Sequence, residues 1–112
     1  MRNEDSILVD STTGLAGVFD GVGGSAAGEI ASQTAARATL QGWQEFVRQQ
    51  QRGRKSYKML ENCDRRDLGT LLCKLILQAD EQVRTEGAQR AGTDDLATTV
   101  ALVSFCWHPH AR

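Results

Sequence analysis

The chain has 112 residues, of which 40% are hydrophobic, and its 13 basic and 14 acidic side chains give a formal net charge of -1. This composition indicates one small globular domain, and the balanced charge argues against a nucleic-acid-binding surface. No apolar run approaches the roughly 20 residues of a membrane span, and acidic residues stand where a signal peptide would be apolar. We therefore expect a cytoplasmic protein that contacts neither nucleic acid nor a membrane.

Two short apolar runs open the chain, at residues 7–9 and 15–19, and turn-forming residues separate them. This pattern predicts two strands joined in a hairpin. Both runs are nearly continuous rather than alternating, which predicts strands buried on both faces.

Helical periodicity begins at residue 25 and continues to residue 47, with many alanines on the apolar face. A polar and basic stretch, 49–55, is best interpreted as a solvated loop. A second stripe of leucines and other apolar residues covers 68–83, with Asp67 as the expected cap and 86–87 as the expected end. A β-branched and aromatic run at 98–107 predicts a third strand, so the expected order is β-β-α-α-β.

The three cysteines are Cys63, Cys73 and Cys106. Their number is odd and they form no CxxC pair, which supports neither a disulfide framework nor a zinc site. Each is expected to be a small buried hydrophobic residue or a bystander.

The most informative stretch is GVFDGVGG at 17–24, where an acid ends an apolar run and glycines follow. Gly21, Gly23 and Ala26 satisfy the GxGxxG/A pattern of dinucleotide-binding turns, but that motif needs a second parallel strand soon after, and helical periodicity continues instead. A purely structural interpretation uses the glycines for a sharp turn and Asp20 as a helix cap.

A metal site is the third interpretation of the same stretch. Asp20 stands at a strand end, and Gly21 can offer a backbone carbonyl with no side chain in the way. Carboxylate and carbonyl oxygens are the ligands that Mg²⁺ or Mn²⁺ prefers. Glu4 and Asp5 open the neighbouring strand and reach the Asp20 end if the strand register allows it.

At these residues the sequence resembles the metal-dependent protein phosphatases of the PPM, or type 2C, family. The resemblance is carried by NEDS, by GLAGVFDGVGGSAAGEIAS and by ATTVALV, which occur in the family's order with two helices before the last. It implies an α+β fold, in which an antiparallel sheet of about three strands carries one pair of long helices on one face. Residues 1–112 would then form a single truncated phosphatase-like domain.

The resemblance also implies a mechanism, in which two Mn²⁺ or Mg²⁺ ions activate a water that attacks phosphoserine or phosphothreonine. Carried over by position, Asp20 would bridge both ions and the carbonyl of Gly21 would bind one of them. Glu4 and Asp5 would hold metal-bound waters in the outer shell. The substrate implied is a phosphoprotein.

The sequence also departs from the family pattern. The family's phosphate-binding arginine would precede Met1, and Arg2 is one residue out of place; Ala97 replaces the glycine of a Gly-Thr-Thr strand. The family's second half, which supplies two more metal-binding aspartates, has no counterpart here. The late acids Asp94 and Asp95 are expected in a turn, and both tail histidines, 108 and 110, are expected to be exposed.

The resemblance therefore predicts a protein serine/threonine phosphatase that is impaired or inactive as an isolated half. The alternative is a non-catalytic interaction or dimerisation module on a phosphatase-like scaffold. A nucleotide-binding domain that uses the glycine-rich stretch is a third hypothesis. The family fold is a β-sandwich flanked by helix pairs, and this chain would supply three strands and one helix pair. The sheet face that a second sheet should bury would then be exposed and apolar. We therefore expect a homo-oligomer, or a partner that supplies the missing half.

Overall fold

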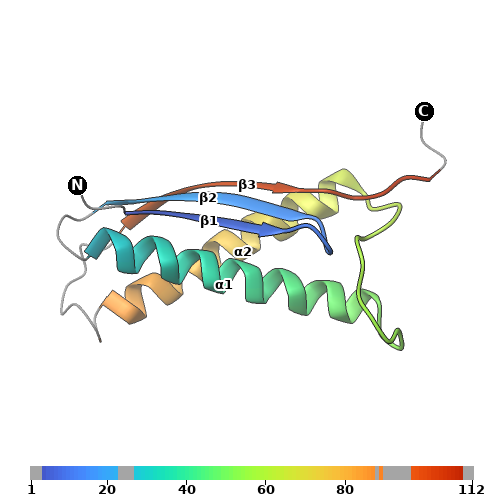
Figure 1. Cartoon of the computed structure of the whole chain (residues 1–112), viewed down its shortest axis with the longest axis horizontal. Coiled ribbons are helices and arrows are strands. Elements are labelled where there is room, and N and C mark those ends of the chain that lie inside the picture. The colour runs from blue at the N-terminus through green and yellow to red at the C-terminus, as the bar shows by residue number, and fades with distance from the viewer. Residues whose placement is uncertain (1–3, 23–26, 88, 90–96, 110–112) are drawn as a thin grey trace.

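The computed structural model describes residues 4–22, 27–87, 89 and 97–109. Two strands come first, then two helices, then a third strand (Figure 1). The elements are β1 (Asp5–Asp10), β2 (Leu15–Val22), α1 (Ala27–Gln50), α2 (Arg65–Glu86) and β3 (Ala97–Ser104). The predicted order and the α+β class are confirmed.

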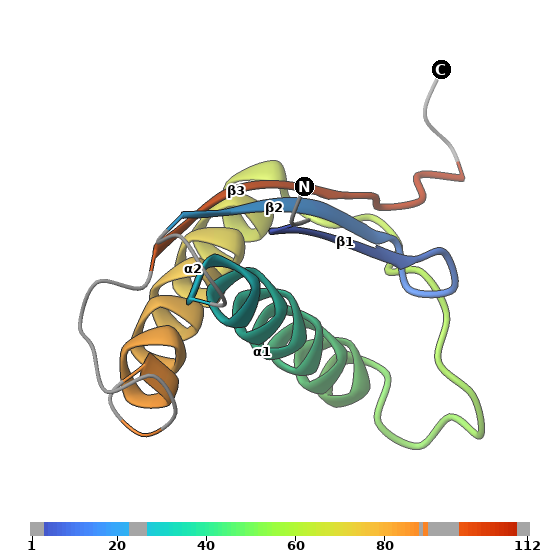
Figure 2. The ribbon, with the colours of Figure 1, turned by 60° about the vertical axis from the view of Figure 1, so that its left-hand side comes forward.

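The three strands form one antiparallel sheet in the order β1-β2-β3. The predicted hairpin joins β1 to β2 through a turn in which Gly14 N donates to Asp10 O at 2.8 Å. Gly14 has a φ of 84°, which a glycine adopts without steric cost. Both helices lie against the same face of the sheet, with α1 and α2 side by side (Figure 2).

The core lies between the sheet and the helices. Phe19 of β2 and Trp43 and Val47 of α1 are completely buried. The strands alternate between buried and exposed positions: Leu8 is buried, whereas its neighbours Ile7 and Val9 are exposed. The prediction of burial on both faces is therefore wrong, because the described chain provides no layer on the side away from the helices.

A chain of side-chain hydrogen bonds connects the hairpin turn to α1. The indole nitrogen of Trp43 donates to Thr13 Oγ1 at 3.1 Å, and that hydroxyl donates to Asp10 Oδ2 at 2.7 Å. Gln44 Nε2 donates to the same carboxylate oxygen at 3.2 Å. These bonds fix the turn end of the sheet against the helix that covers it.

The second helix begins earlier than predicted. Asp64, and not Asp67, is its N-cap, because Asp64 Oδ1 accepts hydrogen bonds from the backbone nitrogens of Arg66 and Asp67. Asp67 instead lies in the first turn, where its negative charge interacts favourably with the positive end of the helix dipole. The predicted end near Glu86 agrees with the structure.

The third strand ends at Ser104, before the predicted limit of 107. Phe105 N still donates to Gly14 O at 2.8 Å, but the chain then leaves β2. Trp107 N donates to Leu60 O at 2.8 Å, and Trp107 O accepts from Asn62 N at 2.8 Å. The end of the predicted strand therefore pairs with the loop between the two helices.

Cys63 and Cys106 form a disulfide across this contact, with their Cα atoms 6.2 Å apart. The prediction that no disulfide forms is wrong, because pairing depends on a contact between residues 43 positions apart that spacing alone does not reveal. Cys73, on α2, is a free and exposed cysteine. Neither described helix has the length and apolar composition that a membrane span requires.

Candidate functional site

The predicted site residues meet at the end of the sheet opposite the hairpin turn. The register pairs Asp5 of β1 with Asp20 of β2, and Asp20 with Thr99 of β3. Thr99 Oγ1 reaches the backbone oxygen of Asp20 at 3.5 Å. Asp5 and Asp20 are both exposed on the face away from the helices. The register of β1 and β2 therefore brings Asp5 next to Asp20.

The electrostatics of this end follow from two carboxyl groups on adjacent strands. The pKa of Asp5 is raised above its ordinary value, first by a side-chain hydrogen bond with Asp20 and then by the negative charge of Asp20. Slight desolvation and the charge of Glu4 act in the same direction. A raised carboxyl pKa next to a second acid marks a place where a proton or a cation relieves repulsion.

Glu4 approaches the same end from the helix side. Its backbone oxygen accepts from Gly21 N at 3.0 Å. Its side chain lies against Gly28 in the first turn of α1, and a Cβ on Gly28 would collide with Oε1. Oε1 is buried, and no hydrogen-bond partner for it is found among the described residues. Such a buried acceptor is unfavourable unless a donor, a water or a cation reaches it.

Gly21 is required by close packing, whatever its chemical role. A Cβ on Gly21 would collide with the carbonyl oxygen of Gly28 and would lie 2.7 Å from the backbone oxygen of Glu4. Gly21 lies inside β2, so at this position the glycine allows close packing and does not form the sharp turn that the structural interpretation assigned to it. Gly23 and Ala26, on which the dinucleotide motif depends, lie outside the described residues.

The acids at this end of the sheet do not gather into one cluster. Asp5 and Asp20 share the exposed face, whereas Glu4 lies on the helix side, and within the described residues no group of three or more acids, histidines or cysteines could hold an ion. Mg²⁺ is commonly held by one or two carboxylates and several waters, so the chemistry of the pair suits a hard cation. The predicted roles of Asp20, Gly21, Glu4 and Asp5 in metal binding remain predictions.

Of the other polar candidates, His108 alone lies within the described residues. Asp94, Asp95 and His110 lie outside the described residues, and His108 is exposed, as expected. Thr99 was not singled out from the sequence, although the ATTVALV stretch contains it. The signal that could have found it is the pairing of that stretch with β2.

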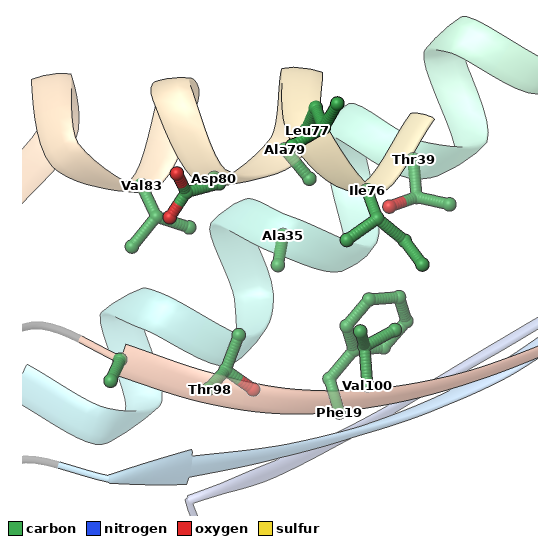
Figure 3. Close-up of a pocket in the computed structure, with 11 residues that line it drawn as sticks. Phe19, Ala35, Thr39, Ile76, Leu77, Ala79, Asp80, Val83, Thr98 and Val100 are labelled. Atoms are coloured by element: carbon green, nitrogen blue, oxygen red, sulfur yellow. The ribbon is translucent and has the colours of Figure 1, made fainter. Parts of the chain in front are cut away.

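An apolar cavity of about 280 Å³ lies elsewhere, between α2, α1 and β3 (Figure 3). Phe19 and Val100 point into it from the sheet, and Ile76 faces them from α2. The hydroxyl of Thr39 is buried there, with no hydrogen-bond partner among the described residues. None of the predicted site residues lines this cavity, so it is separate from the acidic end of the sheet.

The fold matches part of a known phosphatase. The crystal structure of the Mycobacterium tuberculosis serine/threonine phosphatase PstP/Ppp is similar over 94% of this chain, with a TM-score of 0.66 and 23% sequence identity. The match covers 37% of that phosphatase, so this chain spans little more than a third of its length. No family model and no curated protein matches the sequence.

The match confirms the expected fold. The chain has a three-stranded antiparallel sheet with two helices packed against it, and this arrangement resembles part of the PPM phosphatase fold. At this level of identity the similarity establishes the fold alone.

Proposed function

We propose that the chain is the metal-binding part of a PPM-type protein phosphatase, which hydrolyses phosphoserine and phosphothreonine. The observation that carries the proposal is the pairing of Asp5 with Asp20 at one sheet end, with the pKa of Asp5 raised. This pairing occurs in a fold that resembles part of a serine/threonine phosphatase. Neither observation alone identifies a reaction, but together they favour metal-dependent phosphate chemistry.

Each residue has a distinct role in this proposal. Asp20 and the carbonyl of Gly21 would hold Mn²⁺ or Mg²⁺, and Asp5 and Glu4 would accept hydrogen bonds from waters of the outer shell. When bound, the ions would supply an activated water and neutralise the charge of the phosphate. The close packing of Gly21 against Gly28 holds Asp20 in place at the strand end.

The chain alone is expected to be a poor catalyst. One carboxylate and one carbonyl leave most positions around a pair of hard cations to water, which binds them less rigidly than protein ligands do. The transition-state charge is therefore less well stabilised than in a complete phosphatase. We therefore expect slow turnover.

Hydrolysis of p-nitrophenyl phosphate with Mn²⁺ tests the proposal. The expected result is slow turnover that EDTA abolishes and that Asp20→Asn reduces at least 10-fold. Asp10→Asn, at the opposite end of the sheet, is the matched control and should leave turnover unchanged. Turnover that is absent, or that survives Asp20→Asn, would contradict catalysis by this chain.

A second candidate function is association without catalysis. The observation that favours it is the sheet face away from the helices, where Ile7 and Val9 are 75% and 70% exposed. An apolar face of this kind is typical of a surface that another protein covers. Absence of turnover together with a defined complex would favour this candidate.

A further inference from the structure

The loop between the two helices meets the chain that follows β3 at the turn end of the sheet (Figure 1). We call this contact, between residues 60–63 and residues 106–107, the latch. Its backbone part is an isolated parallel bridge with two hydrogen bonds. Trp107 N donates to Leu60 O, and Asn62 N donates to Trp107 O, each at 2.8 Å. The latch therefore joins two segments that the three-stranded sheet does not pair.

The covalent part of the latch is the disulfide between Cys63 and Cys106. The backbone nitrogen of Cys63 also donates to Cys106 Sγ at 3.0 Å. Both cysteines are only partly buried, at the margin of the core. Thiol reagents in solution therefore have access to this bond, as they do to other exposed disulfides.

The rest of the latch is weak without this bond. Leu60 is its one buried residue, and the side chain of Trp107 is 59% exposed. Each backbone hydrogen bond contributes little net free energy, because water offers the same groups other partners when the segments separate. Ordering the backbone of residues 106–109 is unfavourable by more than two such bonds contribute. The disulfide is therefore what keeps the two segments together.

The core between the sheet and the helices lies outside the latch. Phe19, Trp43 and Val47 are completely buried there. The turn end of the sheet has its own connection to α1, through the hydrogen bond from Trp43 Nε1 to Thr13 Oγ1 at 3.1 Å. Opening the latch should therefore leave the sheet and the helices folded.

We propose that the latch is redox-controlled. The oxidised chain holds residues 106–109 on the loop between the helices, and a thiol reductant such as glutathione releases both segments while the core stays folded. This inference goes beyond phosphatase activity and does not depend on it. The latch lies at the turn end of the sheet, whereas Asp5 and Asp20 pair at the opposite end.

The opening step is a thiol–disulfide exchange. A thiolate of the reductant attacks one Sγ atom, the Sγ–Sγ bond breaks, and the other cysteine leaves as a thiolate that takes up a proton. A second thiolate attacks the mixed disulfide and releases the first cysteine in the same way. Two thiols of the reductant thus supply two electrons and two protons, and they become a disulfide themselves.

Hydrogen exchange followed by NMR tests the proposal, because it reports on single amides. Every sample carries Cys73→Ser, which removes the free thiol and prevents disulfide exchange with it. We expect protected amides at Asn62 and Trp107 in oxidised glutathione. In reduced glutathione their exchange should become about 100-fold faster or more, and it should slow again when oxidised glutathione is restored.

Phe19 is the internal reference, because it lies in the central strand and is completely buried. In the reduced protein its amide should remain about 100-fold more protected than those of Asn62 and Trp107. A matched variant, Cys106→Ser on the same background, cannot form the bond and should resemble the reduced protein in both buffers. Alkylation followed by mass spectrometry shows which samples contain the bond.

Several outcomes would overturn the proposal. Protection at Asn62 and Trp107 that persists in the reduced protein would show that the contact does not need the bond. Loss of protection at Phe19 together with them would show that the whole fold depends on the disulfide. A bond that fails to form in oxidised glutathione, or that resists reduced glutathione, would exclude a redox-controlled latch. None of these outcomes depends on whether the chain binds a metal or hydrolyses phosphate esters.

Discussion

The two ends of the sheet use their carboxylates in opposite ways. At the turn end, Asp10 accepts hydrogen bonds from Thr13 N at 3.3 Å, from Thr13 Oγ1 at 2.7 Å and from Gln44 Nε2 at 3.2 Å. Slight burial raises the pKa of Asp10, but the hydrogen bonds from Thr13 and Gln44 outweigh it, and the net direction is downwards. This carboxylate has its donors within the protein and serves the fold.

At the other end, Asp5 and Asp20 face each other across paired strands. The hydrogen bond and the charge of Asp20 move the pKa of Asp5 upwards. Nearby, Oε1 of Glu4 is buried without a hydrogen-bond partner among the described residues. The comparison shows that the carboxylate of Asp10 has hydrogen-bond donors within the protein and stabilises the fold. The acids at the other end suit an additional positive group.

The largest effect is expected from the packing at the acidic end. Gly21→Ala should lower the free energy of unfolding by about 3 kcal/mol or more, because the new Cβ collides with the backbone of Gly28. Gly69→Ala is the control, since Gly69 lies on α2 with open space around it. The free energy of unfolding of that variant, measured by urea unfolding, should rise by about 0.5–1 kcal/mol. Equal effects of the two changes would contradict the close approach at Gly21.

The disulfide near the turn end gives the next largest effect. Cys106→Ser should lower the free energy of unfolding by about 2–4 kcal/mol, because the unfolded chain is no longer closed into a loop. Cys73→Ser removes an exposed free thiol and should have almost no effect. Thermal unfolding with and without a reductant measures the difference. If the wild-type chain were insensitive to reductant, Cys63 and Cys106 would not be joined.

A smaller loss is expected when Asp10 is neutralised. Asp10→Asn should lower the free energy of unfolding by about 1–2 kcal/mol, because it weakens the hydrogen bonds from Thr13 and Gln44. Since the pKa of Asp10 is lowered from 3.8, its contribution is present above that value and is lost as the pH falls through the folded-state pKa. Urea unfolding at a series of acidic pH values should show a flatter profile in the variant. An unchanged profile would contradict the structural role of Asp10.

The smallest effect on stability is expected at Asp5, which is fully exposed. The raised pKa means that ionisation of Asp5 is less favourable in the folded chain, so its contribution to stability decreases as the pH rises through that pKa. Asp5→Asn should therefore slightly raise the melting temperature at neutral pH without metal. It should also weaken Mn²⁺ binding several-fold. A variant that is less stable at neutral pH would contradict the repulsion between Asp5 and Asp20.

Local sequence patterns predicted the order of the elements and suggested that Asp5 and Asp20 lie at the same end of the sheet. The glycine-rich stretch after Asp20 and the acids before β1 pointed to one sheet end, and the register of the hairpin places them there. The sequence did not reveal the disulfide between Cys63 and Cys106, because that pair depends on where the chain goes after β3.

Two other features also depended on tertiary structure. The continuous apolar runs around Ile7 and Val18 suggested two buried faces, but burial depends on which layers are present, and the described chain supplies one. Asp64 competes with Asp67 as a helix cap, and both fit the cap preference. The hydrogen bonds of Asp64 decide between them.

The most direct test of the acidic end is an NMR titration with substoichiometric Mn²⁺, whose unpaired electrons broaden the signals of nearby nuclei. The account predicts that the amide signals of Asp5, Asp20 and Gly21 broaden first, while that of Asp10 does not. Asp20→Asn should abolish this selective broadening, and Asp10→Asn should preserve it. Equal broadening at both ends of the sheet, or selective broadening that persists in Asp20→Asn, would contradict a metal site at this end.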